Sequence, residues 1–208
     1  MANLQSGEVV VDFGCGAGID VILAAHKVGR QGRVVGLDFS PQMIERAKQA
    51  VIASDLQESN IELRVTDLEN TQLPHSFADV VISNCVINLC PDKQAVYGEA
   101  NRILKPGGRL AISDVVLTEK IDPRMRERFQ EHWAGCLGGA VPEKDYRQTI
   151  TNAGLAEIKT VSRHNLTPQE LEAMACCPGK EFTPAAAQAD LAAVQGKVVS
   201  VKFTAVKP

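Results

Sequence analysis

An alternation of short β-branched runs with helical patterns constrains the fold of this chain more than any other feature. The run Val9–Phe13 is apolar enough for a buried strand, and the helical pattern after it ends at Gly29. Ser40 and Pro41 suit the N-cap and the first position of another helix. We expect strands over Val9–Phe13, Arg33–Asp38, Ile61–Val65, Val80–Ser83 and Arg109–Val115, and helices over Ile19–Val28, from Pro41 and over Lys93–Leu104. This order predicts an α/β fold with a parallel, doubly wound sheet.

The pattern changes after Val116. Two further helices, over Pro123–Gly135 and Pro142–Asn152, and two late strands, over Ile158–Val161 and Val198–Ala205, are expected there. A sharp turn over Lys105–Gly108 is expected earlier in the chain, before the fifth strand. The Ala- and Pro-rich stretch Cys177–Gln195 is interpreted as an insertion before the last strand.

Composition excludes several classes of protein. The 208 residues are 45% apolar and 23% charged, which is typical of one globular domain, and the net charge of −3 does not suit a nucleic-acid or membrane-surface binder. Apolar runs such as Val80–Ile82 are too short to cross a bilayer. The first residues show no signal-peptide pattern, so we expect a cytoplasmic protein without nucleic-acid or membrane partners.

A glycine-rich loop, Asp12–Gly18, follows the first expected strand. Gly14, Gly16 and Gly18 allow tight turns and the close approach of a ligand to the backbone. The G-x-G-x-G spacing differs from the G-x-G-x-x-G of dinucleotide sites. Because doubly wound sheets bind ligands at the carboxyl ends of their strands, the loop predicts a small-molecule site there.

Two acidic residues follow the next strands. Asp38 ends the second strand and is placed to accept hydrogen bonds from two ribose hydroxyls, or else serves only the turn before Ser40. Asp67 follows the third strand and is placed to accept a bond from an exocyclic adenine amine, or else is a simple loop residue. Acidic or glycine-rich ends on three successive strands favour a nucleoside-type ligand.

The chain has six cysteines: Cys15, Cys85, Cys90, Cys136, Cys176 and Cys177. No pair has the C-x-x-C spacing of a zinc or redox motif, and a disulfide framework is not expected. Two interpretations are open for each thiol, namely a small buried residue or a ligand for a soft substrate.

Together these features resemble the class I S-adenosylmethionine-dependent methyltransferases. The loop Asp12–Gly18 is similar to their first motif, Asp38 to the acid after their second strand, and Leu104–Gly108 to the turn before their fifth strand. The resemblance implies a Rossmann-like, seven-stranded, mostly parallel sheet whose antiparallel last strand is inserted beside the fifth. It also implies S-adenosyl-L-methionine as cofactor.

A closer resemblance is to the arsenite methyltransferases. It is carried by the blocks Ile82–Leu89, Pro91–Lys93, Ser113–Val116 and Ala134–Ala140. The resemblance implies that Cys85 and Cys136 bind trivalent arsenic and are the catalytic thiols. It implies cofactor contacts from Asp12, Gly14, Gly16, Gly18, Asp38, Asp67 and Asn84. Arsenite and a thiol reductant are the expected small-molecule partners.

The resemblance also divides the chain. We expect residues 1–135 to form the cofactor-binding core, and residues 136–208 to add the substrate loop and the last two strands of the same domain. Members of this family carry an upstream segment that helps to cover the cofactor. With the first strand near Val9, we expect a more open pocket and a third thiolate from Cys176, Cys177 or a small thiol.

Two alternative functions stay open on the sequence alone. One is a methyltransferase of the same fold that acts on a carbon or oxygen of a small organic molecule. The other is a non-catalytic protein that binds the cofactor or sequesters arsenic. The thiols at Cys85 and Cys136 argue against the first rival, because carbon or oxygen methylation has no use for paired thiols.

Overall fold

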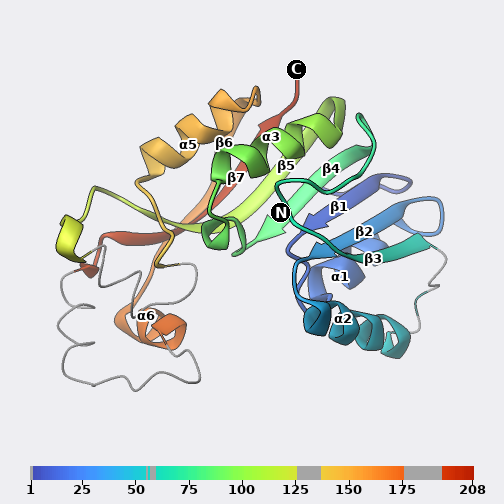
Figure 1. The fold of residues 1–208 in the computed structure, drawn as a ribbon, viewed down its shortest axis with the longest axis horizontal. Coiled ribbons are helices and arrows are strands. Elements are labelled where there is room, and N and C mark those ends of the chain that lie inside the picture. Colours follow the sequence, from blue (N-terminus) through green and yellow to red (C-terminus); the bar gives the residue numbers. More distant parts are fainter. Residues whose placement is uncertain (1, 55, 57–59, 126–136, 176–193) are drawn as a thin grey trace.

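The computed structural model describes residues 2–54, 56, 60–125, 137–175 and 194–208, with no side chains described for 172–175 (Figure 1). Its elements are β1 (Val9–Phe13), α1 (Ile19–Val28), β2 (Arg33–Asp38), α2 (Pro41–Ala53), β3 (Ile61–Val65), β4 (Ala78–Asn84), the 3₁₀ turn η2 (Ile87–Leu89), α3 (Lys93–Ile103), β5 (Leu104–Leu117), α5 (Glu143–Asn152), β6 (Ala156–Asn165), α6 (Pro168–Ala175) and β7 (Val198–Val206).

The strands form one seven-stranded sheet in the order β3-β2-β1-β4-β5-β7-β6. Strands β1 to β5 pair in parallel, whereas β7 is antiparallel to both of its neighbours, β5 and β6. The predicted mostly parallel sheet with its last strand inserted beside the fifth is therefore confirmed.

Helices cover both faces of the sheet (Figure 1). Successive residues of a strand point to opposite faces, and β1 illustrates the result. Val10 belongs to an apolar cluster with Val21 of α1, while Val11 belongs to a second cluster with Tyr97 of α3 and Tyr146 of α5. Burial on both faces explains why the central strands are continuous apolar runs.

Local signals predict the first half of the chain closely. The bounds of β1, α1, β2 and β3 agree with those expected, and Ser40 caps α2 by accepting a hydrogen bond from the amide of Met43. The separate turn expected over Lys105–Gly108 is wrong, because these residues belong to β5. Ala78 pairs with Leu104 and Val80 with Arg109, so the intervening residues form a bulge in a longer strand.

In the C-terminal half the structure adds one helix that was not expected and leaves two predictions mostly untested. Helix α6 was not expected, although the hydrogen bonds between Thr167 and Glu170 form a capping box that the sequence contains. The helix expected over Pro123–Gly135 and the insertion expected over Cys177–Gln195 lie mostly outside the described residues. Within the described part of the chain, every helix is too short or too polar to cross a membrane.

Candidate functional site

The carboxyl ends of β1, β2 and β4 lie side by side at one edge of the sheet. Phe13 is in register with Leu37 of β2 and with Ser83 of β4, so the segments that follow these strands begin at the same level. Parallel pairing thus brings together the glycine loop, Asp38 and Asn84, three features that are far apart in the sequence.

The glycine loop turns sharply above β1. Gly14, Gly16 and Gly18 all have positive φ angles, of 76°, 51° and 88°. A Cβ at Gly14 would lie within 2.6 Å of the Val86 side chain, whereas a Cβ at Gly16 would meet no described atom within 4 Å. Gly14 is thus needed for packing, while Gly16 presents bare backbone to open space.

Asp12 is a buried carboxylate at the base of this loop. Its side chain is 1% exposed, and neither carboxylate oxygen has a hydrogen-bond partner among the residues that the structure describes. Burial raises the pKa of Asp12 well above its usual value, and the charges of Asp20 and Asp38 add to the rise. A buried acceptor of this kind is suited to a cationic or hydrogen-bond-donating ligand.

Asp38 connects the glycine loop with the entry to α2. One carboxylate oxygen accepts a 2.9 Å bond from the Gly16 amide, and the other accepts a 2.9 Å bond from the Ser40 amide. Asp38 therefore has the structural role in the turn. Each of its carboxylate oxygens has a second lone pair, which leaves an acceptor site for a ribose hydroxyl, and that contact stays a prediction.

Asp67 and Asn84 lie on either side of this centre. Asp67 is exposed at the beginning of the turn after β3, next to Thr66, whose amide donates to the carbonyl of Asp38. Asn84 donates a 3.2 Å bond to Asp20 of α1. The Asn84–Asp20 pair lines a cavity of about 680 Å³ that also reaches Leu23.

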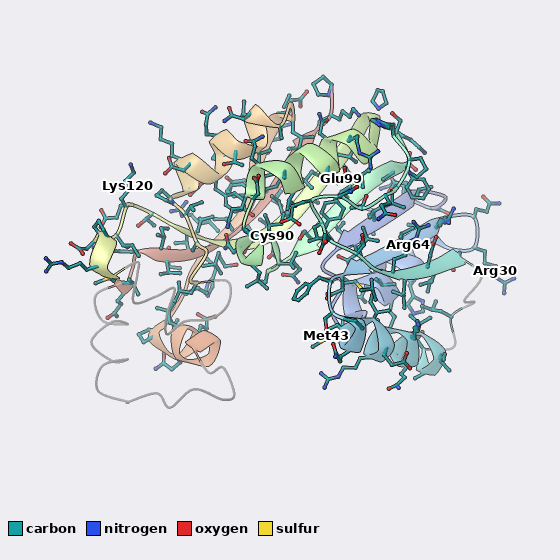
Figure 2. The ribbon with its side chains drawn as sticks, viewed as in Figure 1. Arg30, Met43, Arg64, Cys90, Glu99 and Lys120 are labelled. Atoms are coloured by element: carbon teal, nitrogen blue, oxygen red, sulfur yellow. The ribbon has the colours of Figure 1, made fainter. Side chains whose placement is uncertain are left out.

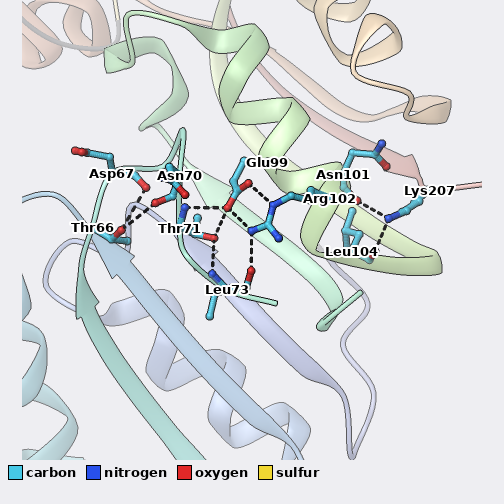
Figure 3. A network of polar contacts seen from close by, with 10 residues as sticks. All are labelled: Thr66, Asp67, Asn70, Thr71, Leu73, Glu99, Asn101, Arg102, Leu104 and Lys207. Atoms are coloured by element: carbon cyan, nitrogen blue, oxygen red, sulfur yellow. Dashed lines mark hydrogen bonds and ion pairs between the residues drawn. The ribbon is translucent and has the colours of Figure 1, made fainter. Parts of the chain in front are cut away.

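The turn that carries Asp67 is fastened to α3 (Figure 3). The carboxylate of Glu99 accepts bonds from the amide and the hydroxyl of Thr71, and Arg102 donates to it from Nε and Nη2 at 2.7 Å. Burial tends to raise the pKa of Glu99, but the bonds from Arg102 and Thr71 outweigh burial and lower it. Arg102 also donates to the carbonyl of Leu73, which fixes the far end of the turn.

Cys85 lies directly after β4 and is exposed. Its backbone is left-handed, with a φ of 55°, and its amide donates a 2.8 Å bond to the carbonyl of Ser113 in β5. A non-glycine residue in this conformation is strained, and such strain is often found at functional sites. The next residue, Val86, packs against Gly14, so Cys85 is one position away from a residue that contacts the glycine loop.

The strain at Cys85 predicts a measurable stability difference. Cys85→Gly should be more stable than Cys85→Ala by about 0.5–1 kcal/mol, because relief of the left-handed backbone outweighs the greater freedom of glycine in the unfolded chain. Chemical unfolding of the two variants measures this difference. An alanine variant as stable as the glycine variant would show that the backbone at Cys85 is unstrained.

The other cysteines divide into two groups. Burial raises the pKa of Cys15 to about 12 and that of Cys90 to about 11, so neither thiol ionises readily at neutral pH. Cys90 lies beside the start of α3 (Figure 2) and contacts the carbonyl of Val86. The predicted ligand Cys136 and the candidates Cys176 and Cys177 lie outside the described residues. The part of the chain that is described holds no cluster of three His, Cys, Asp or Glu able to bind a metal ion.

A buried polar group beneath this region was missed by the sequence analysis. Asp114 of β5 is 1% exposed and accepts bonds from Asn88, from the amide of Val115 and from the hydroxyl of Tyr146. Burial raises the pKa of Asp114 to about 6, although these hydrogen bonds oppose the rise. The signal available in the sequence was a carboxylate inside the apolar run that follows Leu110.

Comparisons with known proteins agree with this geometry. A family model described as a methyltransferase domain matches residues 4–154. The chain is 38% identical over 166 residues to an arsenite methyltransferase of Halobacterium salinarum, covering 80% of this chain and 42% of that protein. It is 32% identical over 170 residues to an arsenite methyltransferase of Homo sapiens, covering 78% of this chain and 45% of that protein. The chain thus spans about half the length of these curated relatives.

Solved structures extend the likeness. An arsenic (III) S-adenosylmethionine methyltransferase from Chlamydomonas reinhardtii superposes with a TM-score of 0.80 at 28% identity, over 98% of this chain and 64% of that chain. A geranyl diphosphate C-methyltransferase from Streptomyces coelicolor has a TM-score of 0.76 at 16% identity, over 100% of this chain and 76% of that chain, and shares the fold.

Proposed function

Because this chain belongs to the methyltransferase domain family, we propose that it transfers a methyl group from S-adenosylmethionine to trivalent arsenic held by the thiolates of Cys85 and Cys136. The substrate is arsenite or its thiol conjugates. The observation that carries the proposal is the position of Cys85, an exposed residue that directly follows β4 and precedes Val86, which packs against the glycine loop.

The strand-end residues fit the cofactor. The buried carboxylate of Asp12 would accept bonds from the ammonium group, and the backbone at Gly14, Gly16 and Gly18 would approach the amino-acid portion. Asp38 would bind the ribose, Asp67 the adenine amine, and Asn84 would contact the cofactor from β4. When bound, the cofactor supplies an electrophilic methyl group on a sulfonium.

The contribution of this chain to the reaction is to position the arsenic against the methyl group. Trivalent arsenic bound by two thiolates keeps a lone pair, so methylation needs no general base. What the protein supplies is a thiophilic centre held at attack distance and in line with the methyl group. A third thiolate comes from Cys176, Cys177 or a small thiol, and a thiol reductant returns the product arsenic to the trivalent state.

Product analysis tests the proposal against its two rivals. The protein is incubated with arsenite, S-adenosylmethionine and a thiol, and the arsenic species are separated. Methylated arsenic supports the proposal. Arsenite recovered unchanged, despite binding of both ligands, supports the non-catalytic binder, and methylation of a small organic acceptor with no methylated arsenic supports the organic-substrate rival.

The cofactor assignment gives its own prediction. Asp38→Ala should weaken cofactor binding by about 1–3 kcal/mol, because charge-assisted bonds to the ribose are lost. Calorimetric titration measures the change. Ser40→Ala is the matched control, since it removes the helix cap at the same turn but keeps the carboxylate. Unchanged affinity in a folded Asp38→Ala protein would refute the assignment.

A further inference from the structure

The turn between β3 and β4 carries Asp67 between two sets of hydrogen bonds. At its beginning, the Thr66 amide donates a 2.9 Å bond to the carbonyl of Asp38, the last residue of β2. Further along the turn, Thr71 and Leu73 bond to side chains of α3. Asp67 is exposed, so the backbone of this turn, rather than packing of its own side chain, sets where its carboxylate lies.

Glu99 of α3 holds the far end of this turn from inside the protein (Figure 3). Glu99 is 7% exposed, and one of its carboxylate oxygens accepts bonds from the Thr71 amide at 2.8 Å and from the Thr71 hydroxyl at 2.5 Å. Arg102, one helical turn later, donates to both oxygens of Glu99 and to the carbonyl of Leu73, each at 2.7 Å. Because donor and acceptor are both charged, the Glu99–Arg102 pair is held by strong hydrogen bonds and binds the turn as one unit.

Apolar packing attaches the turn to α3 without orienting it. Leu68 and Leu73 of the turn are buried in the same core cluster as Tyr97 of α3. Burial of apolar surface is non-directional, so it keeps the turn against α3 but does not fix how the turn is rotated. Hydrogen bonds weaken steeply when their angle departs from linear. The bonds of the Glu99–Arg102 pair are therefore what orients the turn against α3.

We propose that the Glu99–Arg102 pair positions the turn after β3 and thereby gives Asp67 its selectivity for a base that carries an exocyclic amine. This inference rests on the proposed function, in which Asp67 accepts a bond from the adenine amine. The two side chains act through Thr71 and Leu73, so they are positioning residues. Their loss should weaken selectivity for the base and leave the contacts that β1 and β2 make with the rest of the cofactor in place.

Calorimetric titration with two ligands tests the proposal on the 208-residue chain. One ligand is S-adenosylhomocysteine, and the other is its analogue with purine in place of adenine, which lacks only the exocyclic amine. The wild type should bind the first ligand about fivefold or more tightly than the second, as one hydrogen bond to a charged group allows. Asp67→Ala and Glu99→Ala should each remove this preference and leave affinity for the purine analogue unchanged. Glu99→Gln, which keeps a side-chain oxygen for Thr71, should retain most of the preference.

A matched control separates positioning from general destabilisation. Lys207 donates to the carbonyls of Asn101 and Leu104, on either side of Arg102 in the sequence, at 2.7 and 2.8 Å (Figure 3). Lys207→Ala should lower the melting temperature and keep the preference for S-adenosylhomocysteine.

The possible outcomes distinguish this inference from the proposed function. The wild-type preference in folded Glu99→Ala, or an equal loss of affinity for both ligands, overturns this inference alone. If Glu99→Ala does not fold, Thr71→Val, which removes only the hydroxyl bond to Glu99, should reduce the preference, and the full preference in that variant overturns the inference. The wild-type preference in Asp67→Ala overturns the adenine assignment, and this inference with it. A folded wild type that binds neither ligand overturns the proposed function itself.

Discussion

Replacing Asp12 with asparagine is expected to stabilise the free protein while weakening its affinity for the cofactor. The carboxylate of Asp12 is buried without a partner among the described residues, and burial raises its pKa. A carboxyl whose pKa is raised on folding favours the native state below its unfolded pKa. That contribution is lost as the pH rises towards the folded value. At pH 7 the wild type must either bury the charge or hold a proton that the unfolded chain releases, so the neutral isostere should be more stable by about 1–3 kcal/mol, at about 1.4 kcal/mol for each pKa unit.

Two pH series check the Asp12→Asn prediction. Near pH 3 the wild-type carboxyl is already protonated, so the difference in unfolding free energy between wild type and Asp12→Asn should vanish there. Cofactor affinity of the wild type should rise with pH, because the ammonium group binds the ionised carboxylate, whereas the affinity of Asp12→Asn should stay flat. A stability difference that is constant with pH would mean that Asp12 does not titrate differently in the folded state.

Cys85→Ser and Cys136→Ser should each abolish most arsenite binding. A single thiolate is a monodentate ligand, and loss of the second removes an effective-concentration advantage of about 10²–10⁴-fold. Cofactor affinity should change little in either variant. Titration of arsenite, with thermal melts in parallel, measures both effects.

Cys15→Ser is the control for this prediction. Cys15 is buried inside the glycine loop, and burial raises its pKa to about 12, so its thiol is not expected to bind arsenic. The serine variant should bind arsenite like the wild type. If Cys85 and Cys136 are packing residues instead, their serine variants will melt at lower temperature with arsenite affinity unchanged.

The sequence predicts most of the fold because its signals are local. Val9–Phe13 and Ile61–Val65 are short apolar runs, and Ser40 caps α2 as its position before Pro41 indicates. The bulge at Lys105–Gly108 was not predictable, because glycines and a proline read as a turn unless the pairing of β4 with β5 is known. Register between strands is a tertiary property.

The candidate site is predicted less completely, for a related reason. Asp38 matched a ligand pattern, but its bonds to Gly16 and Ser40 depend on how the glycine loop folds back over β2. The hydrogen bond between Asn88 of η2 and Asp114 of β5 joins residues 26 positions apart, and no sequence pattern pairs them. Polar groups that meet only through tertiary contacts cannot be found from periodicity.

A single turnover with labelled cofactor tests methyl transfer to thiol-bound arsenic most directly. The protein is loaded with one equivalent of arsenite, mixed with S-adenosylmethionine that carries an isotopically labelled methyl group, quenched, and separated into arsenic species and protein. We expect the label on arsenic in the wild type and in Cys15→Ser, and no labelled arsenic in Cys85→Ser or Cys136→Ser. Two results would contradict methyl transfer to arsenic held by these two thiolates. One is labelled arsenic at the wild-type rate in both Cys85→Ser and Cys136→Ser, and the other is no labelled arsenic from a wild-type protein that binds both ligands.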